Sequence, residues 1–241
     1  MSRAASTPMR DWSVVDGGDE RVGDGASSRS SRQVLATAVL MAVLVTGAVV
    51  AMNLGQRTGA TSAEDLPDPS LGHEDAPVEL IEYSDFGCPY CGRHARTVKP
   101  EIVDTYVETG LVRYAWRDLP YQGEASHHAA IAARAAQAQG AFWEFHDAVF
   151  ETQDAGLDQD RLRGIANDLG LDLARYDEHI ESRAHEHLIE EGLAEGRQLN
   201  LSGTPSFSVN GRLIVGGQPF EVFADVIEDA AAEAGSGAEQ R

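Results

Sequence analysis

One run of the sequence, VELIEYSDFGCPYC at residues 78–91, joins a strand-like segment to a pair of cysteines. Val78 to Ser84 has the pattern of a short β-strand. Cys88 then begins a helical stretch that extends to about Glu108. Pro89 lies in the first turn of this predicted helix, where its missing N–H costs nothing. Pro100 is expected to kink the helix, because proline removes a helical hydrogen bond.

A second strand follows this helix. Gly110 ends the helical stretch, and Leu111 to Trp116 (LVRYAW) again has a strand pattern. A strand, a helix and a strand within about 40 residues form a βαβ unit, so the two strands are predicted to be parallel with a right-handed crossover.

The rest of the chain divides into a helical block and a short β-β-α unit. Helices are predicted over 129–150, 158–169 and 173–199. Asn210-Gly211, the strongest short hairpin signal, separates two strand-like runs at 206–209 and 213–215. An amphipathic helix over 220–232 follows. The sequence therefore predicts an α/β fold with a β-α-β … β-β-α mixed sheet and a helical insertion at about 123–200.

The two cysteines, Cys88 and Cys91, are the only ones in the chain. A disulfide between them would close a very short loop and add little stability. The pair therefore predicts redox or metal chemistry rather than a structural disulfide. A zinc site would need two further ligands. There is no second Cys-x-x-Cys, and the eight histidines form no compact partner motif. We therefore expect neither a metal nor a cofactor, and a thiol–disulfide centre.

The position of Cys88 at a helix start predicts its reactivity. The unpaired N–H groups and positive dipole end of a helix stabilise a thiolate, and lower a cysteine pKa from about 8.5 to roughly 3.5–7.5. Cys91 lies one turn further along the same face and can close on Cys88. Cys88 is thus predicted to be the exposed, attacking sulfur, and Cys91 the resolving one.

Several motifs together carry a family resemblance. Residues 82–91, the stretch GAFWEFH at 140–146 and Gly203-Thr204-Pro205 resemble the DsbA-type disulfide oxidoreductases, which have a thioredoxin fold. The resemblance covers about residues 76–232, essentially all of the predicted folded part. It implies an enzyme in which Cys88 forms mixed disulfides with substrate and Cys91 is its partner.

The resemblance also implies roles for residues away from the cysteines. Pro205 would be a cis-proline facing the active site, and Thr204 before it would tune the thiolate. Glu82 matches the place of a buried acid that shuttles the Cys91 proton. An exposed Glu at a strand edge is the alternative for that residue. Pro89-Tyr90 between the cysteines departs from the Pro-His of the best-known periplasmic oxidants, which leaves the oxidising strength open.

A membrane segment precedes the folded part. Residues 34–52 contain no charge over 19 positions, which span roughly 28 Å as a helix, close to the thickness of a bilayer core. Arg29 and Arg32 precede the segment and only Arg57 follows it closely. This bias places the N-terminus in the cytoplasm and the cysteines in an oxidising extracytoplasmic space. Cleavage as a signal peptide is the alternative to a retained anchor.

These segments give the expected organisation. Residues 1–33 are predicted to be a disordered cytoplasmic tail, 34–52 a transmembrane signal anchor, 53–76 a linker and 77–235 the thioredoxin-like domain. The charge of the chain is −20, and residues 58–241 carry 34 acidic and only 13 basic residues. Such a surface repels nucleic acid, whose binding we exclude. Lys99 is the only lysine.

The leading expectation is a single-pass membrane protein that oxidises thiols of exported proteins through the Cys88–Cys91 disulfide. The resemblance implies reoxidation by a quinone-linked membrane partner. A reductase or isomerase kept reduced by a membrane electron donor is the first alternative. The others are a pair of chains that ligate an iron–sulfur cluster through Cys88, and a chaperone or binding module with an incidental disulfide.

Overall fold

The computed structural model of the protein describes residues 66–239. The predicted tail (1–33), the predicted anchor (34–52) and the first part of the predicted linker (53–65) lie outside the described residues. Within 66–239, no helix has both the length and the apolar character that crossing a membrane requires.

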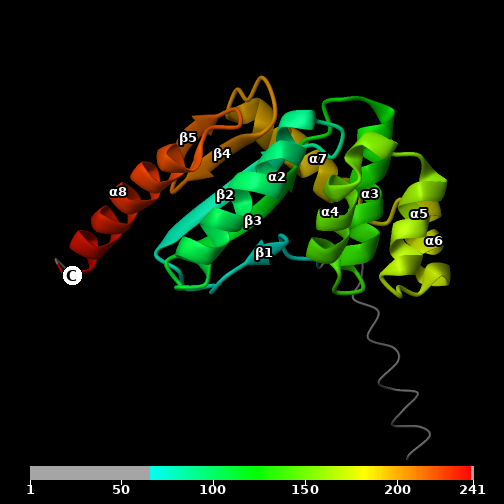
Figure 1. Ribbon diagram of the computed structural model, residues 1–241, viewed down its shortest axis with the longest axis horizontal. Coiled ribbons are helices and arrows are strands. Elements are labelled where there is room, and N and C mark those ends of the chain that lie inside the picture. The colour runs from blue at the N-terminus through cyan, green and yellow to red at the C-terminus, as the bar shows by residue number, and fades with distance from the viewer. Residues whose placement is uncertain (1–65, 240–241) are drawn as a thin grey trace, which may run out of the picture. The chain divides into compact units, whose positions relative to one another are not determined.

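A five-stranded mixed sheet forms the centre of the fold, in the order β1-β3-β2-β4-β5 (Figure 1). The strands are β1 Ser70–Leu71, β2 Val78–Ser84, β3 Val112–Asp118, β4 Ser206–Val209 and β5 Arg212–Val215. β2 is central, parallel to β3 and antiparallel to β4. The predicted parallel βαβ unit and mixed sheet are therefore confirmed.

Helices cover both faces of this sheet. One face packs against α2 (Pro89–Ile102) and α8 (Phe220–Glu239), through a core that includes Leu80, Phe207 and Phe223. The other face packs against α7 (Glu186–Gln198). A Cβ atom on Gly192 would lie 2.3 Å from the carbonyl oxygen of Asp118, so only glycine allows α7 to approach the end of β3 this closely.

The helical insertion is more divided than the sequence pattern predicts. It contains α3 (Glu124–Gln137), α4 (Phe142–Glu151), a 3₁₀ turn η3 (Gln153–Ala155), α5 (Gln159–Asp168) and α6 (Leu173–Ser182), and α7 follows. The predicted helix 129–150 breaks at Gly140, which has a φ of 78°. The predicted helix 173–199 breaks at Arg183, a left-handed C-cap with a φ of 51°.

Three other details differ from the prediction or refine it. Pro100 lies inside α2, and the chain continues as the π-helix η2 (Val103–Val107) before β3. The predicted linker ends earlier than residue 76, because β1 pairs antiparallel with β3 and the Pro69 carbonyl accepts from the Trp116 N–H at 2.9 Å. A two-residue strand between prolines and glycine has no recognisable sequence pattern. The predicted Asn210-Gly211 hairpin is confirmed, with positive φ at both residues.

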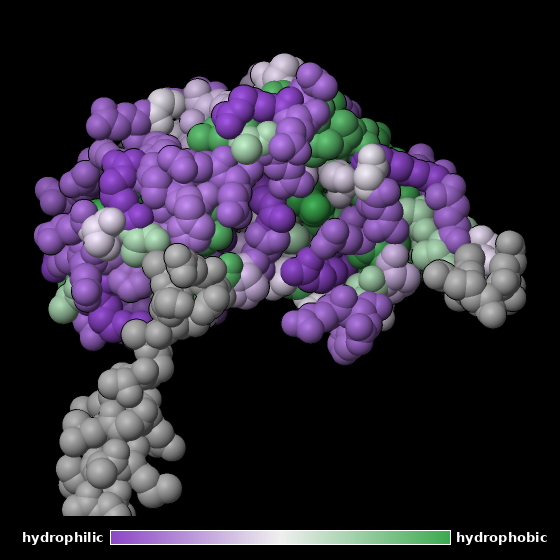
Figure 2. Space-filling view, turned by 180° about the vertical axis from the view of Figure 1, so that it is seen from behind, coloured by the Kyte–Doolittle hydropathy of each residue, from purple (hydrophilic) through white to green (hydrophobic). Residues whose placement is uncertain are grey.

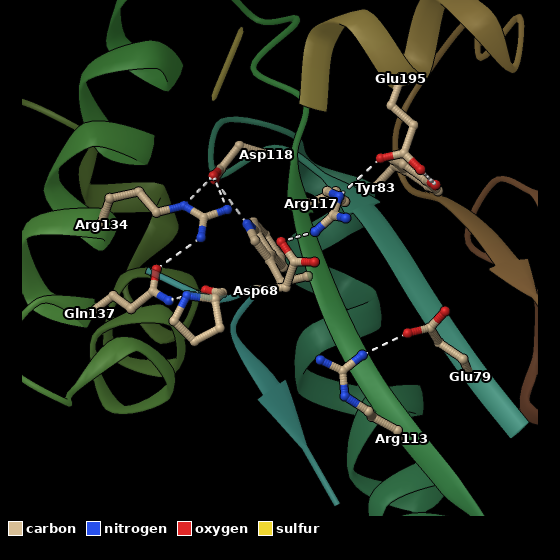
Figure 3. Close-up of polar contacts among 11 residues, drawn as sticks. Asp68, Glu79, Tyr83, Arg113, Arg117, Asp118, Arg134, Gln137 and Glu195 are labelled. Carbon is tan, nitrogen blue, oxygen red and sulfur yellow. Dashed lines mark hydrogen bonds and ion pairs between the residues drawn. The ribbon is translucent and has the colours of Figure 1, made fainter. Parts of the chain in front are cut away.

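A buried ion pair joins the insertion to the sheet (Figure 3). Arg134 on α3 donates through Nε to Asp118 Oδ2 at 2.6 Å, and Trp116 Nε1 donates to the other oxygen at 2.8 Å. Across β3, Arg117 bridges Asp68 and Glu195. These contacts fix α3 and α7 to the strand that runs beside the cysteine-bearing strand-to-helix connection.

The surface of the described part is mostly hydrophilic on the face shown in Figure 2, with hydrophobic residues gathered in the upper part of that view. The large hydrophobic side chains that are exposed among the described residues are Tyr90, Tyr121, Leu213 and Val215.

Candidate active site

Cys88 and Cys91 lie where β2 passes into α2. Cys88 is the N-cap of α2, with extended backbone dihedrals (φ −83°, ψ 119°), and Pro89 occupies the first turn as predicted. Both cysteines are free thiols. Cys88 is 3% exposed, so the expectation of an exposed sulfur is wrong for this reduced state. The Cys88 sulfur lies 3.2 Å from the carbonyl oxygen of Thr204, on the loop that faces it.

The two thiols have opposite acidities. A hydrogen bond with the Cys91 side chain is the main cause that lowers the pKa of Cys88 to about 6. Thr204 and the backbone N–H groups of Tyr90 and Cys91 lower it further, against the effect of burial. Cys91 is fully buried, and burial, the Cys88 sulfur and the charge of Glu82 all raise its pKa. At neutral pH Cys88 is therefore the thiolate and Cys91 the protonated partner.

The loop opposite the cysteines is built as the resemblance implies. The Thr204–Pro205 peptide bond is cis. The Pro205 carbonyl accepts from the Gly216 N–H at 2.9 Å, which ties this loop to the end of β5. Tyr90, between the cysteines, is 60% exposed and lies at the molecular surface. The cis-proline loop, the Cys88 thiolate and an exposed aromatic ring thus come together.

Glu82 lies inside the fold, beneath the cysteine pair. It is fully buried on β2, the central strand, which excludes the alternative of an exposed residue at a strand edge. The Tyr114 hydroxyl donates to Glu82 Oε2 at 2.5 Å, while the buried Oε1 has no hydrogen-bond partner within the described residues. His94 Nε2 lies 3.2 Å from the Tyr114 hydroxyl.

Two polar side chains that the sequence did not single out, those of Gln153 and Asp85, hold the active-site loop. Gln153 Nε2 donates to the carbonyl oxygens of Phe86 at 2.8 Å and Cys88 at 2.9 Å. Asp85 accepts from the N–H groups of Gly87 and Gln122, each at 2.7 Å. The only available signal was Asp85, a short acidic residue two positions before a glycine, which is typical of a turn. Gln153 lies far along the chain in a segment without a pattern.

An aromatic core that includes Phe142 and Phe145 of α4 lies behind the loop. His146 is fully buried in it, with its ring 4.9 Å from that of Trp116 and 4.8 Å from that of Phe150. Lys99 on α2 is 5% exposed, pairs with Asp147 at 2.7 Å and lies 4.7 Å from the Trp143 ring centre. Among residues 66–239, no three His, Cys, Asp or Glu side chains are grouped to hold a metal ion.

Comparisons with known proteins agree with this geometry. A family model described as Thioredoxin matches residues 64–229. A probable disulfide bond formation protein D of Bacillus anthracis is 29% identical over 60% of this chain and 70% of its own length. The crystal structure of alpha-DsbA1 of Wolbachia pipientis superposes with a TM-score of 0.65 at 25% identity, and covers 73% of this chain and 99% of that one.

A second group of relatives consists of much longer proteins. The Na⁺/H⁺ antiporter NhaA 3 of Salinispora tropica is 39% identical over 75% of this chain, but the matched part is only 28% of the antiporter. The chain spans between about a quarter and a third of the length of the first antiporters that it matches. From its fold, its paired cysteines and these matches, the chain belongs to the thioredoxin family and resembles the DsbA-like thiol–disulfide oxidoreductases.

Proposed function

We propose that the protein oxidises thiols of exported proteins through a Cys88–Cys91 disulfide. The observation that carries this proposal is the low pKa of Cys88, about 6, beside a Cys91 thiol that stays protonated. A site that stabilises the Cys88 thiolate favours the reduced form of the enzyme. The corresponding disulfide is then a good oxidant, because Cys88 is a good leaving group.

The proposed reaction has two exchange steps. A substrate thiolate attacks the Cys88 sulfur, the Cys88–Cys91 bond breaks, and Cys91 leaves and takes up a proton. A second substrate thiolate then attacks the substrate sulfur of the mixed disulfide and releases Cys88 as a thiolate. The substrate gains a disulfide and loses two electrons, which the cysteine pair receives. The cis-proline loop of Thr204 and Pro205 would hold the substrate segment beside Cys88.

We further propose that this chemistry takes place outside the cytoplasm, on a chain anchored by residues 34–52. The uncharged segment and the arginines before it support this location. So does the likeness to part of a Na⁺/H⁺ antiporter, a membrane transport protein by its name. Continued turnover needs an electron acceptor, and a quinone-linked membrane protein is the partner that we propose.

The redox equilibrium of the full chain with glutathione, measured in detergent, tests the direction of electron flow. An oxidase is expected to have a potential well above the value of about −270 mV that is typical of thioredoxin. A potential near or below that value would identify a reductase instead. The in-cell redox state gives an independent check, because an oxidase is held mainly as the disulfide.

A further inference from the structure

Within residues 66–239, only one of the two oxygens of the Glu82 carboxylate has a hydrogen-bond donor. Tyr114 donates to Oε2, whereas Oε1 is buried and accepts no hydrogen bond from the described residues. A buried carboxylate oxygen without a donor is costly. Cys91 is a buried donor close enough for the Glu82 charge to raise its pKa. Oε1 is thus the Glu82 oxygen that is left without a hydrogen-bond donor in the part of the chain that the structure describes.

The strand register places Tyr114 where it can hold the other oxygen. Glu82 pairs with Trp116 across the parallel β2–β3 ladder, and Leu80 pairs with Tyr114. Residues two apart on a strand share a face, so Tyr114 is the diagonal neighbour of Glu82 on the face that α2 covers. From α2, Cys91 and His94 face the sheet together, because residues three apart lie on one side of a helix.

Glu82, Tyr114 and His94 form a row of hydrogen-bonded side chains, and the chemistry of these groups fixes which of them donates to which. Tyr114 has a single hydroxyl hydrogen, and donates it to Glu82 at 2.5 Å. His94 must then donate from Nε2–H to the Tyr114 oxygen at 3.2 Å. The His94 ring is neutral, since burial, and secondarily Lys99, lowers its pKa to about 3. The His94 ring packs against Phe207 and Phe223, with ring centroids 4.5 and 5.3 Å away.

Few other charges act on this row. The titratable groups that interact with it are Cys91, His94 and Lys99 from α2, and His146 and Asp147 from α4. β4 and α8 contribute the apolar rings of Phe207 and Phe223. His146 is neutral because burial lowers its pKa, and Lys99 is paired with Asp147. Tyr114 is thus the direct hydrogen-bond donor to the carboxylate.

We propose that Tyr114 and His94 are positioning residues that hold the Glu82 carboxylate in place and leave its Oε1 free to take the Cys91 proton. This inference rests on the proposed roles of Cys91 and Glu82. The proton moves from Cys91 Sγ to Glu82 Oε1, and the Cys91 thiolate attacks the Cys88 sulfur of a mixed disulfide. The Cys88–Cys91 bond forms, the bond to the bound thiol compound breaks, and that sulfur leaves as a thiolate. In the reverse direction Glu82 returns the proton to Cys91.

The two exchange steps can be timed separately. The reduced full chain, in detergent, is mixed with glutathione disulfide, quenched in acid at intervals and analysed by mass spectrometry. The mixed disulfide reports the attack by Cys88, and the internal disulfide reports the attack by Cys91. Tyr114→Phe is expected to slow only the second step, by about tenfold at neutral pH, because removing a hydrogen-bond donor disfavours the charged form of a buried carboxyl group. The rate of the second step should recover at higher pH.

Three variants complete this experiment. Tyr106→Phe is the matched control, since it removes another hydroxyl-to-glutamate bond (Tyr106 to Glu228 Oε1, 2.9 Å) far from the cysteines. It should leave both steps unchanged. His94→Phe keeps an aromatic ring but removes the donor to Tyr114, and should shift the pH profile in the same direction by a smaller amount. It also serves if Tyr114→Phe does not fold. In a Glu82→Gln background, Tyr114→Phe should have no further effect.

The outcomes separate the possible failures. Equal slowing of both steps at every pH would show a merely structural role for Tyr114 and overturn the inference. So would an unshifted pH profile in both Tyr114→Phe and His94→Phe. If Glu82→Gln leaves the second step unchanged, the proton role of Glu82 itself is wrong. None of these rates decides between an oxidase and a reductase, which the glutathione equilibrium decides independently.

Discussion

The side-chain amide of Gln153 donates a hydrogen bond to the carbonyl oxygen of Cys88 at 2.9 Å. The same nitrogen donates to the Phe86 carbonyl at 2.8 Å. One side chain of the helical insertion thus holds the backbone on both sides of Gly87, immediately before the active-site helix. The insertion therefore supports the cysteine loop directly as well as covering it.

Gln153→Ala is expected to destabilise the protein by about 1–3 kcal/mol, because two partly buried carbonyl groups lose their donor. Gln153→Glu should cost more, since a carboxylate would face two carbonyl oxygens. Urea unfolding of both variants measures these changes. Gln159→Ala, an exposed glutamine on α5, is the control and should be close to neutral. Equal stability of the Ala and Glu variants would contradict the hydrogen-bonding role.

Gly92→Ala should act through Gln153. A Cβ atom at Gly92 would lie 2.2 Å from Gln153 Oε1 and 2.9 Å from Arg96 Nη1. The substitution is therefore expected to destabilise the wild type, but to cost less in a Gln153→Ala background, where helix propensity favours alanine by about 1 kcal/mol. Gly164→Ala on α5, with no atom within 4 Å of the added Cβ, should stabilise the protein. Additive effects at residues 92 and 153 in urea unfolding would refute the coupling.

The pKa of Cys88, about 6, should depend on a donor at residue 91. Cys91→Ala removes the hydrogen bond that lowers this pKa most, so the value is expected to rise toward the usual 9.0. Cys91→Ser retains a hydroxyl donor and should stay nearer to 6. Thiolate ultraviolet absorbance, followed against pH, measures both variants. Identical titrations of the Ala and Ser variants would show that the helix start alone sets the acidity of Cys88.

The same shift predicts how the stability of the reduced protein depends on pH. The pKa of Cys88 is lower in the folded state than its usual value of 9.0, so the folded state binds fewer protons between pH 6 and 9. The stabilisation that the Cys88 thiolate contributes to the folded state is fully present above pH 9 and is lost as the pH falls through about 6. Above pH 9 the raised pKa of Cys91 acts in the opposite direction. Cys88→Ser should remove the rise between pH 6 and 9 in urea unfolding.

Asp118 and Arg134 form a pair that should be costly to break. Both side chains are 1% exposed. Arg134→Met would leave the Asp118 carboxylate buried without its ion-pair partner, with an expected loss of about 3–5 kcal/mol. The double variant Asp118→Leu/Arg134→Met should recover part of this loss. The exposed Arg163–Asp177 pair is the control, and Arg163→Met should produce no measurable change in urea unfolding.

The sequence contained the elements of the active site, but not their supports. Residues 78–91 predicted the strand, the helix start and the cysteine pair because these features are local. The resemblance implied the cis bond before Pro205, which the structure contains. Gln153 could not be predicted, because its role depends on a tertiary contact across 65 residues and its own segment has no pattern. Tyr114 and His94 appeared to be ordinary strand and helix residues.

The predicted helix boundaries were wrong where the backbone conformation of a single residue decides them. Gly140 and Arg183 each interrupt a pattern that is continuous in hydrophobic spacing, since their positive φ values reverse the chain. Glycine at 140 was a visible signal, whereas arginine at 183 was not. The edge strand β1 is too short for any periodicity to be detected, and exists because β3 offers it backbone partners.

The burial of Lys99, finally, makes the reactivity of a single amine a measure of how often the active-site helix moves away from its neighbour. It is the only lysine of the chain, and it is closed in between α2 and α4 by Asp147 and Trp143. We expect a water-soluble acylating reagent to reach this amine faster when the two helices separate. Mass spectrometry distinguishes acylation at residue 99 from acylation at the N-terminus. The rate at residue 99 therefore reports how often α2 and α4 separate in the native protein. Comparing this rate between the disulfide and dithiol forms would show how tightly the redox state of the cysteines is coupled to the packing behind them.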